Sequence, residues 1–185
     1  CDWSSDVCSS DLHQKFMADA LAGLSTAQKT LPSKYFYNDR GSELFERICE
    51  LPEYYVTRVE TALLKQVANE VAEVIGEGAS IIEYGTGSSE KINILLNALN
   101  PPAAFVGVDI SGGALRGVTY AMAINFPNMS IHGVCADFTQ PLELPAMSGS
   151  GTRVVFFPGS SLGNFDHDQS VSFLANAAST VGPGG

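Results

Sequence analysis

The sequence predicts a doubly wound α/β fold, in which helices cover both faces of a parallel sheet. Three observations favour this class. Short runs that are apolar almost throughout follow one another along the chain, segments with helical periodicity separate them, and a glycine turn follows the first run. Strands of this kind are typical of parallel sheets buried on both faces, and their crossovers are right-handed.

The chain before the first strand is expected to be helical. Residues 1–12, CDWSSDVCSSDL, have no periodic pattern and no signal-peptide core, so they are interpreted as an unstructured or non-native leader, with a lipoprotein terminus as the alternative. Residues 13–78 are expected to form three helices. The first helix is expected to start near Gln14, and the second to be capped by Ser42. The third is expected to open with the capping-box pattern TRVE and to end at glycine. Its buried apolar face is expected to consist of Leu63, Val67, Val71 and Val74.

Residues 79–185 are predicted to form the first four strands of the sheet with their helices. The strands are expected in SIIEY, AFVGVDI, SIHGVCAD and RVVFFP. The helical faces between and after them are expected at Ile92, Leu95, Leu96 and Leu99, then at Leu115, Val118 and Met122, and lastly in DHDQSVSFLANAAST behind an Asp166 cap. Together with the helices before it, this arrangement defines the fold as α/β.

Composition restricts the partners of the protein. The 185 residues suit one domain, and 20 acidic against 10 basic side chains give a net charge of −10, which disfavours nucleic acid and anionic membranes. No apolar run approaches the roughly 20 residues of a membrane-spanning helix. The cysteines are few, and Cys49 and Cys135 stand alone in apolar surroundings, which is typical of small buried side chains. Reduced thiols and a cytoplasmic location are therefore expected. No metal site is predicted.

A cationic ligand is expected at the end of the first strand. Doubly wound sheets bind ligands past the carboxyl ends of their strands, and Gly85 and Gly87 allow a close approach to the main chain there. Glu90 occupies the place of the third glycine of a dinucleotide fingerprint, where it would repel a pyrophosphate. Glu83 is expected to add to the negative field, so an NAD-linked oxidoreductase is the disfavoured alternative.

Two further strand ends carry acids that suit an adenosine. Asp109 ends the second strand, where an acid accepts hydrogen bonds from ribose hydroxyls. Asp137 and Phe138 end the third and offer an acceptor for an exocyclic amine and an apolar ring beside the base. Each acid alone could be an ordinary turn residue. The three strand ends in order instead indicate S-adenosylmethionine, whose sulfonium is positively charged.

The loop after the fourth strand, FFPGSSLGNF, lies where the reacting centre would be. Asn164 offers both a donor and an acceptor to the head group of an amino acid. A plain strand-to-helix loop is an equally good interpretation of these residues.

Several long motifs resemble a known family. LPSKYFYNDRGSELFERICELPEYYVTRVE, EYGTGSSEKINILL, VGVDIS, ADFT, FFPGSSLGNF and GPGG closely resemble the histidine-specific S-adenosylmethionine-dependent methyltransferases, typified by the histidine Nα-methyltransferase of ergothioneine biosynthesis. The resemblance runs from about Ala18 to Gly185. Tyr84 and Thr86 depart mildly from the leucine and serine that are more usual beside the glycines.

The resemblance implies a class I methyltransferase sheet and assigns residues to the site. It implies cofactor contacts from Gly85, Lys91, Asp109, Asp137 and Phe138. It implies that Tyr55 holds the imidazole of the substrate, that Asn164 binds its head group, and that Tyr37 and Phe45 line the pocket. A core aromatic cluster is the alternative for these rings. No catalytic residue is assigned, and His13, His132 and His167 are poorly placed to accept a proton.

The expected activity is transfer of a methyl group to the α-amine of an amino acid, with L-histidine as first choice. Another aromatic amino acid, such as a tryptophan derivative, and an inactive cofactor-binding fragment are the alternatives. Members of the family are longer, so the chain is expected to be a C-terminally truncated, inactive fragment. The oligomeric state and the number of methyl groups transferred are not predicted.

Overall fold

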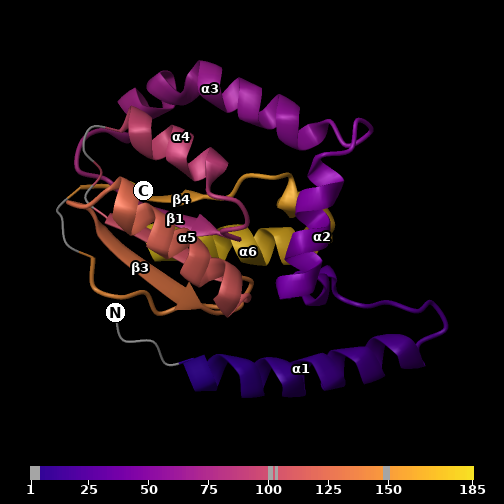
Figure 1. Ribbon diagram of the computed structural model, residues 1–185. Helices are drawn as coiled ribbons and strands as arrows, with labels where there is room; N and C mark the ends of the chain where they lie inside the picture. Colours follow the sequence, from indigo (N-terminus) through magenta and orange to yellow (C-terminus); the bar gives the residue numbers. More distant parts are fainter. Residues whose placement is uncertain (1–4, 100–101, 103, 148–150) are drawn as a thin grey trace.

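The computed structural model describes residues 5–99, 102, 104–147 and 151–185 and forms three layers (Figure 1). A parallel four-stranded sheet lies in the middle, in the order β3-β2-β1-β4. The strands are β1 (Ser80–Tyr84), β2 (Ala104–Asp109), β3 (Ser130–Cys135) and β4 (Arg153–Phe156). Each coincides with a run predicted from the sequence, and the doubly wound class is confirmed.

Register brings the strand ends level with one another. Glu83 of β1 lies opposite Gly107 of β2 and Phe156 of β4, and Asp109 of β2 lies opposite Cys135 of β3. The carboxyl ends of the strands therefore meet at one edge of the sheet. The loops that carry the predicted site residues leave from that edge.

Two hydrophobic clusters attach helices to the two faces of the sheet. On one face α4 (Glu90–Ala98), with Leu99 just after it, and α5 (Gly112–Asn125) pack against Ile81 and Phe105. The residues predicted for these faces are all buried, which are Ile92, Leu95, Leu96, Leu99, Leu115, Val118 and Met122. On the other face α6 (His167–Val181) buries Phe173 and Ala177 against β1 and β2. The predicted Asp166 cap is present as a capping box with Gln169.

The N-terminal segment contains three helices, as predicted, and one short 3-10 helix. These are α1 (Ser5–Ser25), η1 (Ser33–Phe36), α2 (Asp39–Cys49) and α3 (Val56–Ile75). Figure 1 shows α3 lying along α4 and α2 standing at the end of the sheet to which the strands point. The expected division at residue 78 falls in the turn between α3 and β1.

Helix starts in this segment differ from the predicted ones. Helix α1 begins at Ser5, inside the stretch expected to be unstructured, because no Gly or Pro interrupts the backbone ladder there; residues 1–4 lie outside the described residues. The cap of α2 is Asn38, whose side chain accepts the N–H of Gly41 at 2.8 Å, and Ser42 lies within the helix. Helix α3 starts at Val56 without a side-chain cap.

The buried face of α3 matches the predicted one only in part. Leu63 is 55% exposed and Val74 is 88% exposed. The face that packs inward contains Thr61 and Ala68, followed by Val71 and Ile75. Val71 belongs to both sets and both have helical spacing, so packing against the core decides which residues are buried.

Two findings concern location. Cys135, at the end of the edge strand β3, is disulfide-bonded, whereas every thiol was expected to be reduced; Cys49 is free. Within the described ranges, no helix has the length and apolar character needed to cross a membrane.

Candidate functional site at the strand ends

The turn after β1 brings the main chain to the open edge of the sheet. Gly85 has a φ of +75°, a conformation that favours glycine, and its N–H donates to the carbonyl of Val108 at 2.8 Å. A Cβ at Gly85 would lie 3.8 Å from the Phe138 ring. A Cβ at Gly87 would also fit without a clash, because the nearest atom, the carbonyl oxygen of Gly85, would be 3.9 Å away. The structure therefore places the β1 turn directly beside the end of β3.

Asp109 is buried at the end of β2. Its Oδ1 accepts the N–H of Ser111 at 2.8 Å, and its Oδ2 lies 3.5 Å from the Thr86 hydroxyl, which can donate to it. Burial raises the pKa of Asp109, and these hydrogen bonds oppose the shift. The side chain is thus fixed next to the glycine turn, as the prediction of a ribose-binding acid requires.

Glu83 is buried on β1. Its Oε2 has no hydrogen-bond partner among the residues that the structure describes. Burial, reinforced by the charge of Asp109 and opposed by Lys91, raises its pKa to about 8. Glu83 is therefore largely protonated at neutral pH, and the expectation that it adds to the negative field of the site is wrong.

Asp137 at the end of β3 is held by three donors. Its Oδ2 accepts from Lys34 Nζ at 2.8 Å, and its Oδ1 accepts from the backbone N–H and the hydroxyl of Thr139. Burial disfavours the charged form, but the hydrogen bonds from Lys34 and Thr139 outweigh it and hold the pKa of Asp137 below its usual value. The carboxylate is ionised and its plane is fixed.

Phe138 belongs to an aromatic cluster on the α6 face of the sheet. Its ring stacks on Tyr84 at 5.7 Å between centroids and makes an edge contact with Phe157 at 5.5 Å. Phe173 closes the cluster from α6. The ring reaches the Gly85 turn only with its edge, so most of its surface serves the core.

Lys91, in the first turn of α4, forms an ion pair with Glu60 of α3. The other oxygen of Glu60 accepts the N–H of Gly159, in the loop after β4, at 2.7 Å. Lys91 is mostly buried, whereas an ordinary first-turn lysine is solvated. The structure thus brings Lys91 together with the β4 loop, and Glu60 is a member of the site that sequence reasoning missed.

The aromatic residues of the N-terminal segment form a second cluster. Tyr37 and Phe45 lie 5.8 Å apart, and Phe45 contacts the ring of Tyr54 at 5.8 Å. Tyr55 is 63% exposed, and no ring contact joins it to this cluster. The ring that accompanies Tyr37 and Phe45 is therefore Tyr54 rather than Tyr55. Nothing in the dipeptide itself distinguishes the two tyrosines.

Asn164 ends the short helix η2 (Ser161–Asn164) and its side chain is exposed. Ser160 precedes η2 with a φ of +59°, which turns the chain sharply after Gly159. The β4 loop is thus an ordered turn that presents Asn164 on its surface.

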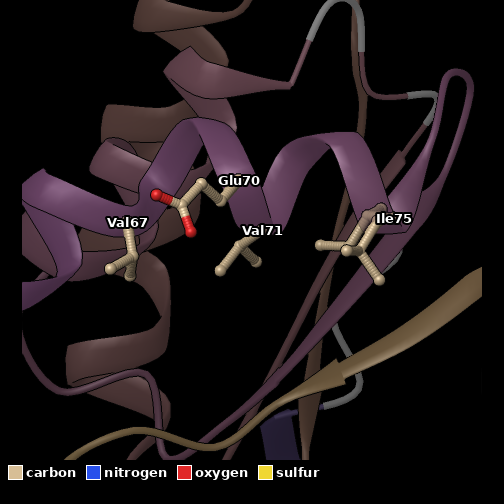
Figure 2. Close-up of a pocket in the computed structure, with 5 residues that line it drawn as sticks. Val67, Glu70, Val71 and Ile75 are labelled. Carbon is tan, nitrogen blue, oxygen red and sulfur yellow. The ribbon is translucent and has the colours of Figure 1, made fainter.

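An apolar depression of about 330 Å³ lies elsewhere, on the C-terminal half of α3. Val67, Glu70, Val71, Val74 and Ile75 line it, and Figure 2 shows Val67, Val71 and Ile75 along one side of the helix. Helix α3 ends at Ile75 shortly before β1 starts, so the depression lies toward the amino ends of the strands. It is separate from the predicted site. In the described part of the chain, no group of His, Cys, Asp and Glu is arranged to hold a metal ion.

Comparison with known proteins identifies the family. Residues 16–185 match the family described as histidine-specific, SAM-dependent methyltransferases. The chain belongs to this family. The match begins within α1, covers α2, α3 and all four strands, and confirms the family that the sequence motifs resemble.

Individual relatives agree with this assignment. Histidine N-alpha-methyltransferase of Mycolicibacterium smegmatis is 38% identical over 90% of this chain and 52% of its own length. 4-Dimethylallyltryptophan N-methyltransferase of Claviceps purpurea is 28% identical over 94% of the chain and 52% of its length. The chain thus spans about half the length of these curated relatives.

A solved structure supports the fold. Magnesium protoporphyrin IX methyltransferase from Synechocystis PCC 6803, determined with bound SAH, has a TM-score of 0.50 with 15% identity, and the match covers 79% of this chain and 65% of that one. The chain described here therefore has the Rossmann-like sheet of a methyltransferase.

Proposed function

We propose that the protein is an S-adenosylmethionine-dependent N-methyltransferase that acts on the α-amine of L-histidine. The observation that carries the proposal is the set of strand ends, Gly85, Asp109 and Asp137, adjoining one another within a chain that matches the histidine-specific family from residue 16 to residue 185. The role in ergothioneine biosynthesis that the sequence motifs imply follows from this substrate.

The residues at the strand ends fit S-adenosylmethionine. The Gly85 turn leaves room for a ligand against the main chain, and Asp109 is fixed beside it for ribose hydroxyls. Asp137 is ionised and retains acceptor capacity for an exocyclic amine after its three hydrogen bonds. Lys91, next to the β4 loop, Gly87 and the edge of the Phe138 ring are the other residues that we propose contact the cofactor.

The substrate is assigned to the side of the site formed by the N-terminal segment and the β4 loop. Tyr37, Phe45 and Tyr54 provide aromatic surfaces of the kind that pack against an imidazole. Tyr55, which the motifs imply for contact with the imidazole, is 63% exposed beside this cluster and stays a candidate together with Tyr54. Asn164 offers a donor and an acceptor to the carboxylate and amine of the amino acid.

Orientation is the main chemical task of these residues. S-adenosylmethionine supplies a methyl group on a positively charged sulfur that is already a good leaving group. The protein must align the amine lone pair with that methyl group and exclude water. Because the α-amine of a free amino acid is largely protonated near neutral pH, it must lose a proton to an acceptor before attack. Fixed carboxylates at the strand ends and an ordered β4 loop provide the rigid frame for this alignment.

The test is transfer of a labelled methyl group by the full-length protein. We expect transfer from S-adenosylmethionine to L-histidine, and weaker transfer to 4-dimethylallyltryptophan, since the similarity to the histidine enzyme is greater than that to the tryptophan enzyme. Transfer to the tryptophan derivative alone would support the alternative substrate class. Binding of cofactor without transfer to any amino acid would contradict the proposed activity.

We also propose a cytoplasmic location, because S-adenosylmethionine is a cytosolic metabolite. We further propose that the partner of the protein is an amino acid and not a nucleic acid. The net charge of −10 supports the second point. Fractionation of cells that express the full-length protein tests the location. The test is informative because Cys135 is disulfide-bonded, and disulfides are rare in cytosolic proteins.

A further inference from the structure

Two charged residues assigned to the cofactor site are each paired with an opposite charge from the N-terminal segment. Lys34 of η1 contacts Asp137, and Glu60 of α3 contacts Lys91. We propose that Lys34 and Glu60 are positioning residues, through which the N-terminal segment holds the cofactor-binding groups in their binding geometry. This inference rests on the proposed function, because it requires Asp137 and Lys91 to face the cofactor.

Lys34 controls the orientation of Asp137. The two residues are 103 positions apart, and their side chains meet at 2.8 Å, with only 8% of the Asp137 side chain exposed. Lys34 is bonded to Oδ2, whereas Thr139 supplies both donors to Oδ1. Without Lys34, one carboxylate oxygen would lack its charged donor, and the carboxylate would be free to tilt about the Thr139 contacts.

Glu60 connects two separate parts of the site. One oxygen forms the ion pair with Lys91 at the start of α4, and the other accepts the Gly159 N–H in the β4 loop. Gly159 has a φ of +92°, and a Cβ there would be 3.7 Å from Lys91 Nζ. Glu60 therefore fixes the lysine and the loop against each other at close range.

Partial burial makes these pairs different from ordinary surface ion pairs. The side chains of Lys91 and Asp137 are 12% and 8% exposed, whereas those of Arg40 and Glu43, which also form an ion pair, are 67% and 65% exposed. Exposed pairs contribute little. Removal of one member of a buried pair leaves the other without compensation and disturbs its position. The Arg40–Glu43 pair is thus a matched control within the same segment.

The proposal predicts weaker cofactor binding from changes outside the cofactor-contacting set. In the full-length protein, Lys34→Met and Glu60→Gln should each raise the dissociation constant of S-adenosylhomocysteine about tenfold, the scale of a charged hydrogen bond. Lys34→Arg should restore most of the affinity because it keeps the charge. Arg40→Met and Glu43→Gln should leave the dissociation constant unchanged.

Calorimetry in a double-mutant cycle tests whether the two residues act through their partners. In an Asp137→Asn background, Lys34→Met should change the affinity less than twofold, and in a Lys91→Met background Glu60→Gln should do the same. Unchanged affinity in the single variants, or losses that add in full to those of the partner variants, would overturn the proposal. Thermal melts confirm that each variant is folded, and Lys34→Gln replaces Lys34→Met if the latter does not fold.

The outcome for the unmodified protein separates this inference from the proposed function. If the unmodified protein does not bind S-adenosylhomocysteine, the proposed function is wrong and the positioning role falls with it. If it binds, and the variants bind equally well, only the positioning role is wrong.

Discussion

The carboxyl of Glu83 links the stability of the protein to pH. Its pKa in the folded protein is about 8, above the ordinary value of 4.5, and burial is the main cause. The folded state therefore holds a proton that the unfolded state has lost between these two pH values, so stability decreases as pH rises through this window. The unpartnered Oε2 is consistent with a group that is kept neutral.

We expect Glu83→Gln to stabilise the protein more at pH 8.5 than at pH 5, because glutamine is neutral at both. A difference of about 3 °C in melting temperature would correspond to roughly 1 kcal/mol for a domain of this size. Melting curves of both proteins at the two pH values measure it. An equal effect of the substitution at pH 5 and pH 8.5 would show that Glu83 does not hold the proton.

Asp109 tests the cofactor site at the β2 end. Asp109→Ala should weaken S-adenosylmethionine binding by about 1 to 3 kcal/mol, the cost of lost hydrogen bonds to a buried ligand. Calorimetry with the full-length protein measures the change. Glu73→Ala, which removes an exposed acid of α3, is the control for net charge. Unchanged affinity in Asp109→Ala would remove the ribose-binding role.

Asn164 tests the substrate side. Asn164→Ala should impair histidine binding more than cofactor binding, because Asn164 lies in the β4 loop and the adenosine acids lie at the ends of β2 and β3. Separate titrations with histidine and with S-adenosylhomocysteine measure the two effects. Equal losses for both ligands would indicate a collapsed loop instead of a substrate contact.

At the scale of elements, β4 is the vulnerable strand. Among the described residues it pairs along one side only, with β1, and its sequence is RVVF. Unpaired backbone groups on an apolar edge promote association between molecules. We expect a polypeptide of residues 1–185, produced by itself, to be poorly soluble or partly unfolded and to transfer no methyl group to histidine.

Size-exclusion chromatography with light scattering, followed by a thermal melt and a methyl-transfer assay, tests this expectation. A monodisperse, cooperatively melting polypeptide that methylates histidine would contradict it. In that case the four-stranded sheet would be sufficient for both folding and activity.

The strands were predictable because each is a short apolar run with a polar or glycine-containing boundary, as in SIIEY before Gly85. Helix α6 was predictable because its cap, Asp166, uses only local contacts. Local patterns were ambiguous in the N-terminal segment. Asn38 and Ser42 are both good capping residues, and two faces of α3 have helical spacing, so packing against α4 decided what the sequence left open.

At the scale of the whole molecule, the topology made part of the site predictable. Parallel strands bring their carboxyl ends to one edge, so the order of Gly85, Asp109 and Asp137 along the chain was enough to predict that they lie at the same edge of the sheet. The contacts of Lys34 and Glu60 were not predictable in this way. Lys34 contacts Asp137, 103 positions away, and Glu60 contacts Lys91, 31 positions away. No periodic pattern in the sequence predicts pairs of residues that are so far apart.

The central claim is that these strand ends bind S-adenosylmethionine. Calorimetric titration of the full-length protein with S-adenosylhomocysteine and, separately, with NAD tests it most directly. We predict saturable one-to-one binding of S-adenosylhomocysteine and no heat of binding with NAD, because Glu90 in the first turn of α4 would repel a pyrophosphate bound at the start of that helix. Binding of NAD, or of neither ligand, would contradict it.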